Sequence, residues 1–123
     1  MLKKTKCYSK GRIEDKTHVE YLLVCLGQDL TIIISGGASH IGSLSHTKKQ
    51  GDETTYRYTY PTHRDDVIVD KAIRELQQAI EGELLVVGGI HYDDISKEQI
   101  EIIVKNSDDL LEEIKNDLKN RVL

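Results

Sequence analysis

Alternation of apolar and polar positions runs through the first half of the chain and predicts strands. Three segments follow this pattern, 5–13, 41–47 and 54–60, and two more predicted strands, 18–26 and 30–35, are apolar runs; polar or glycine-containing breaks separate all five. A period of two directs alternate side chains to opposite faces of a sheet. An antiparallel meander is the simplest arrangement of these segments.

The segment 54–60 places Tyr56, Tyr58 and Tyr60 on a single face of its strand. We interpret these rings as core or dimer-interface residues, because aromatic side chains dominate both environments. The alternative is that they stack on a planar ring such as a flavin.

The period changes after Pro61, which ends the last of these strands. Thr62 is expected to cap a helix that continues to about residue 80, with Asp65 in its first turn favourable against the helix dipole. The segment 83–90 is then nearly all apolar, which predicts a strand at the centre of the sheet.

A second helix is predicted to begin at Ser96, because Ser96 and Gln99 match the capping box. Its apolar stripe continues to Leu118, although residues 106–109 form another start signal that allows a break into two pieces. These elements predict one α+β domain over residues 1–123, with helices packed on a sheet.

Two glycine–histidine segments come directly after buried strands. Gly36 and Gly37 precede His40 and Gly42 in the first segment, and Gly88–Gly89 precede His91 in the second. Glycine at a strand exit allows a sharp turn or a close approach of another group. We therefore expect His40 and His91 to share one pocket.

Metal binding is a weak prediction for these residues. His40, His63, His91 and Asp93 have the chemistry of zinc or iron ligands, but none lies at the spacing of a dedicated metal motif. Ser39 beside His40 does not indicate nucleophilic catalysis, since neighbours on a strand point to opposite faces.

Anion binding is better supported by the sequence. The backbone of 36–42 offers amide donors, and Thr62, His63 and Arg64 lie at a predicted helix start, where amides face outward. The Arg64 guanidinium suits a phosphate or carboxylate. These features predict a small anionic ligand.

Charge and composition narrow the class of protein. The chain has 123 residues and a formal net charge of −4, which argues against a nucleic-acid partner. It has no long apolar run and no signal-peptide pattern, so we expect a cytoplasmic protein that does not enter a membrane. Cys7 and Cys25 are expected to be reduced, with Cys25 in the core.

Three motifs together resemble the prenylated-flavin chaperone (LpdD-like) family, whose namesake is the small D subunit that accompanies gallate decarboxylase. They are Gly-Gly-x-x-His-Ile-Gly at 36–42, Pro-x-His-Arg-Asp at 61–65, and Gly-Ile-His-x-Asp followed by Ser-x-Glu-Gln-Ile at 89–100. The combination and its order are more specific than any one motif.

The resemblance implies a fold similar to that of proteasome assembly chaperones: a bent antiparallel sheet of about six strands, two helices on one side, and a homodimer. It also implies a role beside UbiD-type decarboxylases, which use prenylated flavin mononucleotide (FMN). In that setting the small subunit supplies or stabilises the cofactor and is not itself an enzyme. By position, the family's motif residues correspond to Gly36, Gly37, His40, Ile41, Gly42, His63, Arg64, His91 and Asp93.

The hypothesis that combines both lines of reasoning is a cytoplasmic, homodimeric, non-enzymatic accessory protein that binds FMN or prenylated FMN. The backbone of 36–42 and the helix start at 62–64 would hold the phosphate, and His40, His63 and His91 would line the pocket. One alternative is an assembly chaperone that binds only protein. The other is a small histidine- or metal-dependent enzyme that uses His91 and Asp93 as an oriented base.

Overall fold

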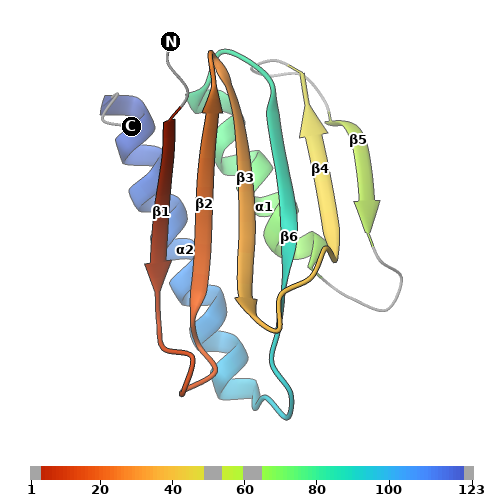
Figure 1. Ribbon diagram of the computed structural model, residues 1–123, viewed down its shortest axis with the longest axis vertical. Coiled ribbons are helices and arrows are strands. Elements are labelled where there is room, and N and C mark those ends of the chain that lie inside the picture. The colour runs from red at the N-terminus through yellow and green to blue at the C-terminus, as the bar shows by residue number, and fades with distance from the viewer. Residues whose placement is uncertain (1–3, 49–53, 60–64, 121–123) are drawn as a thin grey trace.

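The structure is a computed structural model that describes residues 4–48, 54–59 and 65–120 (Figure 1). Its elements in chain order are β1 (Lys4–Lys10), β2 (Val19–Leu26), β3 (Asp29–Gly37), β4 (Ser43–Thr47), β5 (Thr54–Thr59), α1 (Asp66–Leu76), a 3₁₀ turn (Gln77–Ala79), β6 (Leu84–His91) and α2 (Lys97–Asn120). The predicted α+β class is confirmed, and each predicted strand is present with ends shifted by a few residues.

The strands form a six-stranded sheet in the order β1-β2-β3-β6-β4-β5. The central position predicted for β6 is confirmed, but the expectation of a wholly antiparallel sheet is wrong, because β6 pairs in parallel with β3. The chain leaves β5, crosses over through α1 and enters the sheet between β3 and β4. Such a helical crossover is how neighbouring strands become parallel.

Both helices cover the same face of the sheet, behind the strands in Figure 1. Alternate residues of β2, β3 and β6 point into the layer between sheet and helices, where Tyr21, Leu23, Ile32, Ile34, Leu84 and Val86 are buried. From the helices, Val69, Leu76 and Ile114 complete this core. Cys25 is buried as predicted, and burial raises the pKa of its thiol.

The first helix is shorter than predicted. It runs from Asp66 to Leu76 with Asp65 as its N-cap residue, and Thr62, the expected cap, lies outside the described residues. In the part of the chain that the structure describes, no helix is long and apolar enough to cross a membrane.

The second helix does not break at residues 106–109. Its capping box is confirmed: the Gln99 amide donates to Ser96 Oγ (3.1 Å) and the Ser96 amide to Gln99 Oε1 (2.8 Å). The predicted break fails because Asn106 and Ser107 are buried and find partners across the core. The Ser107 hydroxyl is hydrogen-bonded to that of Tyr21, and the Asn106 side chain bonds to the backbone of the β1–β2 connection.

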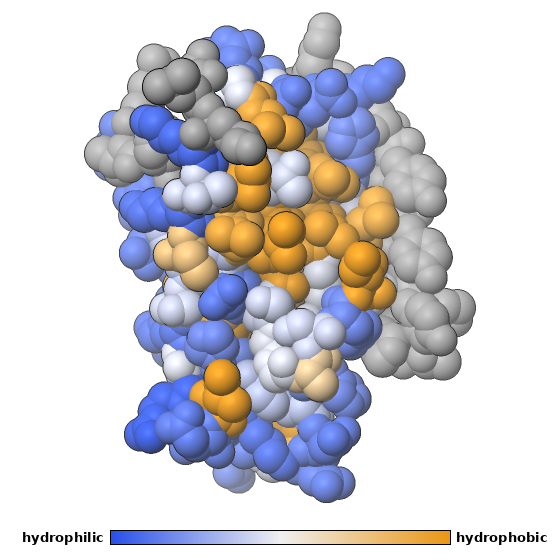
Figure 2. Space-filling view, in the orientation of Figure 1, coloured by the Kyte–Doolittle hydropathy of each residue, from blue (hydrophilic) through white to orange (hydrophobic). Residues whose placement is uncertain are grey.

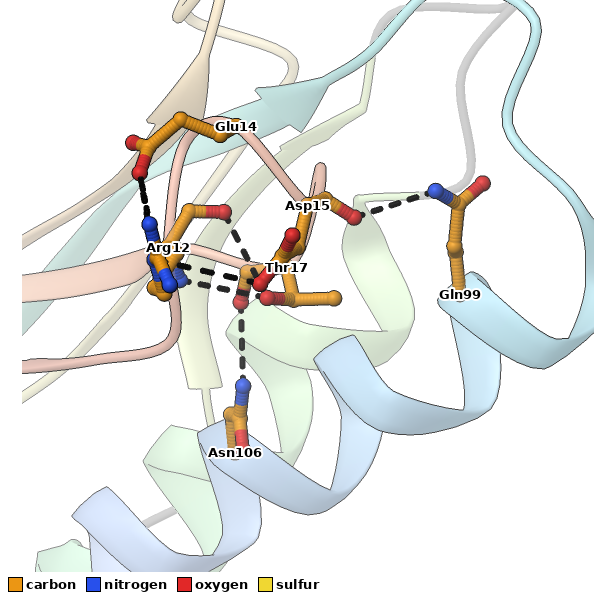
Figure 3. A network of polar contacts seen from close by, with 6 residues as sticks. All are labelled: Arg12, Glu14, Asp15, Thr17, Gln99 and Asn106. Atoms are coloured by element: carbon orange, nitrogen blue, oxygen red, sulfur yellow. Dashed lines mark hydrogen bonds and ion pairs between the residues drawn. The ribbon is translucent and has the colours of Figure 1, made fainter.

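The β1–β2 connection is fastened to α2 by side-chain amides (Figure 3). Asn106 Nδ2 donates to the carbonyl of Thr17 (3.0 Å), and Gln99 Nε2 to that of Asp15 (3.0 Å). Just beyond, the His18 carbonyl accepts the hydroxyl of Tyr92 (2.7 Å). The β1–β2 connection is thereby held both to α2 and, through Tyr92, to the segment that follows β6.

Candidate functional site

The parallel pairing of β3 and β6 brings the two glycine–histidine segments together. Both strands end at the lower edge of the sheet in Figure 1, where Gly36 pairs with Ile90 and Gly37 with His91. The rings of His40 and His91 meet edge to face, with centroids 6.1 Å apart and an interplanar angle of 74°. The predicted proximity of His40 and His91 is confirmed within one chain.

A buried carboxylate lies behind His40. The Asp65 side chain is only 10% exposed, and its Oδ2 is 3.2 Å from His40 Nε2. Both atoms are inaccessible to solvent, and they are close enough for an ion pair although the orientation is not that of a hydrogen bond.

Asp65 also links this contact to β6. Its Oδ1 accepts a hydrogen bond from the Ile90 amide (3.1 Å), while its side chain makes no capping bond to its own helix. The Asp65 side chain therefore contacts His40 and the β6 backbone and does not cap the helix that follows it.

Two glycines make room for the His40–Asp65 contact. A Cβ at Gly42 would lie 2.0 Å from Asp65 Oδ2 and 3.0 Å from His40 Nε2. At Gly89 it would lie 3.0 Å from the same carboxylate oxygen and 2.8 Å from the His40 carbonyl oxygen. All four distances are shorter than van der Waals contact, so this close approach explains Gly42 of the first motif and Gly89 of the second.

His91 has its own carboxylate on the exposed side of the site. His91 Nε2 is 2.9 Å from Asp93 Oδ1, and the two side chains are 44% and 87% exposed. Lys16 reaches the same segment, because its ammonium donates to the Asp93 carbonyl oxygen (2.6 Å). The site thus contains one buried and one exposed histidine–aspartate pair.

The backbone of 36–42 is largely occupied by bonds within the protein. The Gly36 amide donates to Ser39 Oγ, the Ser39 amide to the Gly37 carbonyl, the Ala38 amide to the His91 carbonyl and the Gly42 amide to the Gly88 carbonyl. The Ala38 and Gly42 amides hold the segment onto β6, the Gly36 and Ser39 amides close the loop on itself, and none of the four is directed at a ligand. The predicted phosphate cradle would therefore have to rely on side chains or on the remaining amides.

Two aliphatic side chains close to the site residues in sequence are exposed. They are Ile41, part of the first motif, and Val67, in the first turn of α1. Exposed aliphatic side chains beside polar groups are typical of a surface that binds an amphipathic ligand or a partner.

Several predicted residues cannot be placed. His63 and Arg64 lie outside the described residues, as does Tyr60. Tyr56 and Tyr58 occupy register positions on β5 opposite His46 and Leu44 of β4. Within residues 4–48, 54–59 and 65–120, no group of three or more histidine, cysteine or carboxylate side chains could hold a metal ion.

Asp65 is the site residue that sequence reasoning missed. Its position in the sequence predicted a role at the helix terminus. A signal for the site was nevertheless present, because Asp65 closes the Pro-x-His-Arg-Asp motif.

Comparison with known families matches residues 13–119 to the family described as "Prenylated flavin chaperone LpdD-like domain". Among curated proteins, the chain is similar to "Protein LpdD" of Lactiplantibacillus plantarum, with 27% identity over 100 residues that cover 78% of this chain and 74% of that protein. The resemblance inferred from the three motifs is confirmed. Since the family match covers most of the sequence, this chain belongs to the prenylated flavin chaperone LpdD-like family.

Proposed function

We propose that the protein is a non-enzymatic accessory protein of a UbiD-type decarboxylase and holds prenylated FMN, or FMN, at the His40–His91 edge of the sheet. The observation that carries the proposal is the meeting of the two motif histidines, each beside a carboxylate, at one solvent-accessible edge. Membership of the prenylated flavin chaperone family supports the choice of ligand class.

The chemistry of the site suits a flavin phosphate. Imidazole is the side chain whose protonation changes near neutral pH, and a protonated ring donates to a phosphate. Asp65 lies against His40 Nε2 on the buried side of the ring, and His91 lies next to the same ring. Ile41 and Val67 offer apolar contact for the ring system or its prenyl group.

Charge balance requires a further cation for a phosphate dianion. In the described part of the site, Asp65 and Asp93 bring two carboxylates, and Lys16 adds one positive charge near Asp93. We propose that Arg64, which directly precedes Asp65 in the second motif, supplies the remaining charge.

A non-enzymatic role is supported by the hydrogen bonds of Ser39, the hydroxyl next to His40 in sequence. The Ser39 hydroxyl, next to His40 in sequence, accepts the Gly36 amide and lies 3.4 Å from the Gly37 carbonyl oxygen. It is a structural group of the loop and not a nucleophile positioned by a histidine.

The proposal is tested by equilibrium titration of FMN and prenylated FMN, followed by flavin fluorescence. His91→Ala is the informative variant, because His91 is partly exposed and its removal leaves the buried pair intact. We expect saturable binding by the wild type and at least about tenfold weaker binding by His91→Ala, the loss of roughly one charge-assisted hydrogen bond.

His46→Ala is the matched control. His46 Nε2 also lies 2.8 Å from a carboxylate oxygen, that of Glu83. This pair is at the start of β6, whereas the site is at its last residues. Equal flavin affinity in all three proteins, or no saturable binding, would overturn the proposal. Co-purification with a decarboxylase that is unchanged by His91→Ala would then favour the protein-only chaperone.

A further inference from the structure

The connection between β1 and β2 brings a lysine to the edge of the sheet where His40 and His91 meet. Lys16 Nζ donates a hydrogen bond to the Asp93 carbonyl oxygen (2.6 Å), although the two residues are 77 positions apart in the chain. The same Asp93 places its Oδ1 2.9 Å from His91 Nε2. One residue therefore joins the Lys16 ammonium to the exposed histidine of the site.

Lys16 differs from the ion-paired lysines of the fold in the group that it contacts. Its hydrogen bond goes to a neutral carbonyl oxygen, and no carboxylate within residues 4–48, 54–59 and 65–120 forms an ion pair with it. Other lysines lie within ion-pair distance of a carboxylate, namely Lys6, Lys10, Lys71, Lys105 and Lys115. The Asp93 carbonyl takes one of the three N–H donors of the Lys16 ammonium and leaves its charge without a carboxylate in direct contact.

The backbone of Lys16 adopts a conformation that suits glycine better than lysine. Its φ is +58°, in the left-handed region where a Cβ crowds the following carbonyl oxygen. Two backbone bonds close the turn, from the Lys16 amide to the Ile13 carbonyl (3.0 Å) and from the Thr17 amide to the Arg12 carbonyl (3.1 Å). Because an exposed hydrogen bond largely replaces one to water, the contact with Asp93 does not by itself explain a lysine at this position.

The neighbours of Lys16 on both sides are fixed to α2, as Figure 3 shows. Gln99 Nε2 donates to the Asp15 carbonyl, and Asn106 Nδ2 donates to the Thr17 carbonyl (3.0 Å each). The Lys16 backbone is thus held in place from both sides, with its ammonium beside Asp93, before any ligand arrives. Positioning a binding group in advance reduces the entropy that is lost when a ligand binds.

The surface at this edge suits a charged group. Figure 2 shows hydrophilic side chains over much of the lower end of the molecule, where the β1–β2 connection lies, and apolar side chains gathered higher on the sheet. The carboxylates of Asp93 and Asp94 would repel an anion, but both residues are exposed, so water and salt screen their charge. Direct contact with the Lys16 ammonium is the stronger interaction for an anion at this edge, because little solvent separates the two charges.

We propose that Lys16 binds the anionic group of the ligand at the His40–His91 edge and makes the site prefer a flavin that carries a phosphate. The inference rests on the proposed flavin site and adds the β1–β2 connection to it. An ammonium and a phosphate oxygen form a charge-assisted hydrogen bond, which is stronger than one between neutral groups. Riboflavin, which has the same ring system without the phosphate, lacks this contact.

Titration of FMN and of riboflavin, followed by flavin fluorescence, tests the inference in Lys16→Gly. Glycine accepts the φ of +58°, so this variant removes the ammonium without straining the turn. We expect the wild type to bind FMN more tightly than riboflavin. Lys16→Gly should lose at least about tenfold in affinity for FMN and less than about twofold for riboflavin, whereas Lys16→Arg, which keeps the charge, should retain the preference for FMN.

Lys105→Ala is the matched control, because it removes the same charge from an exposed side chain (74%) on α2 and should leave both affinities unchanged. Urea unfolding establishes that each variant is folded, and Lys16→Asn, which also accepts a left-handed φ, replaces Lys16→Gly if the latter is not. Unchanged FMN affinity in Lys16→Gly, or equal losses for FMN and riboflavin, would overturn the inference and leave the flavin site standing. A wild type that binds neither flavin would overturn the proposed function and this inference with it.

Discussion

Replacing Gly42 by alanine should destabilise the protein through a single steric conflict. Gly42 does not have a positive φ, so alanine is acceptable to the backbone. Its added Cβ, however, would lie 2.0 Å from Asp65 Oδ2. The carboxylate cannot simply turn away, because Asp65 Oδ1 accepts the Ile90 amide and His40 lies on its other side.

The size of the stability loss follows from which hydrogen bond has to lengthen to accommodate the new Cβ. Either the Asp65–Ile90 hydrogen bond or the bond from the Gly42 amide to the Gly88 carbonyl (3.1 Å) has to lengthen. The loss of one such bond, together with overpacking, corresponds to about 1–3 kcal/mol. In an Asp65→Ala background the clash with Oδ2 is gone and only the longer contact to His40 Nε2 (3.0 Å) is left, so the same Gly42→Ala change should cost less than about 0.5 kcal/mol. The difference between the two costs is the coupling expected of residues in contact.

Urea unfolding of the four proteins in this double-mutant cycle measures the coupling. Gly27→Ala is the control, because its Cβ would meet nothing within 4 Å but its φ is +63°. It should cost about 1–2 kcal/mol from backbone strain alone, equally in both backgrounds. The steric reasoning is refuted if Gly42→Ala costs the same with and without the Asp65 carboxylate.

Two further predictions concern the layer between sheet and α2. Tyr21→Phe should cost about 1–2 kcal/mol in urea unfolding, because it leaves the buried Ser107 hydroxyl without its partner, and adding Ser107→Ala should recover most of the loss; no recovery would contradict this explanation. The Tyr8 hydroxyl and the Lys6 ammonium lower the pKa of Asp117, so its contribution to stability is present above the unfolded-state pKa and is lost as pH falls through the folded-state pKa. Asp117→Asn should therefore flatten the loss of stability below about pH 4, and an unchanged pH profile would argue against the assignment.

Local features of the fold were predictable because they depend on neighbouring residues. The alternating segments and the apolar runs predicted all six strands, and the Ser96–Gln99 capping box predicted the start of α2. The parallel pairing of β6 with β3 was not predictable in this way. Both strands are apolar on both faces, and the pattern does not specify which neighbour each one takes.

The expectation of a break in α2 at residues 106–109 was wrong for the same reason, and the helix is continuous there. Polar residues that usually start a helix are instead buried within one, because Thr17 and Tyr21 from distant strands supply their hydrogen bonds. Local sequence indicates a preference, and the partners that override it come from elsewhere in the chain.

The candidate site was predictable in position but not in its internal chemistry. Two glycine–histidine segments after buried strands correctly indicated that His40 and His91 meet. The sequence could not show that Asp65 turns from the helix terminus toward His40, nor that the amides of 36–42 bond to β6. Both outcomes depend on the parallel β3–β6 pairing.

The most direct test of the proposed function is thermal unfolding with and without prenylated FMN, compared with FMN. A ligand that binds only the folded state raises the unfolding midpoint in a saturable way. We predict such a rise for the wild type and its loss or reduction in His91→Ala. No shift at ligand concentrations well above micromolar, in a protein that remains folded, would contradict a flavin site at the His40–His91 edge.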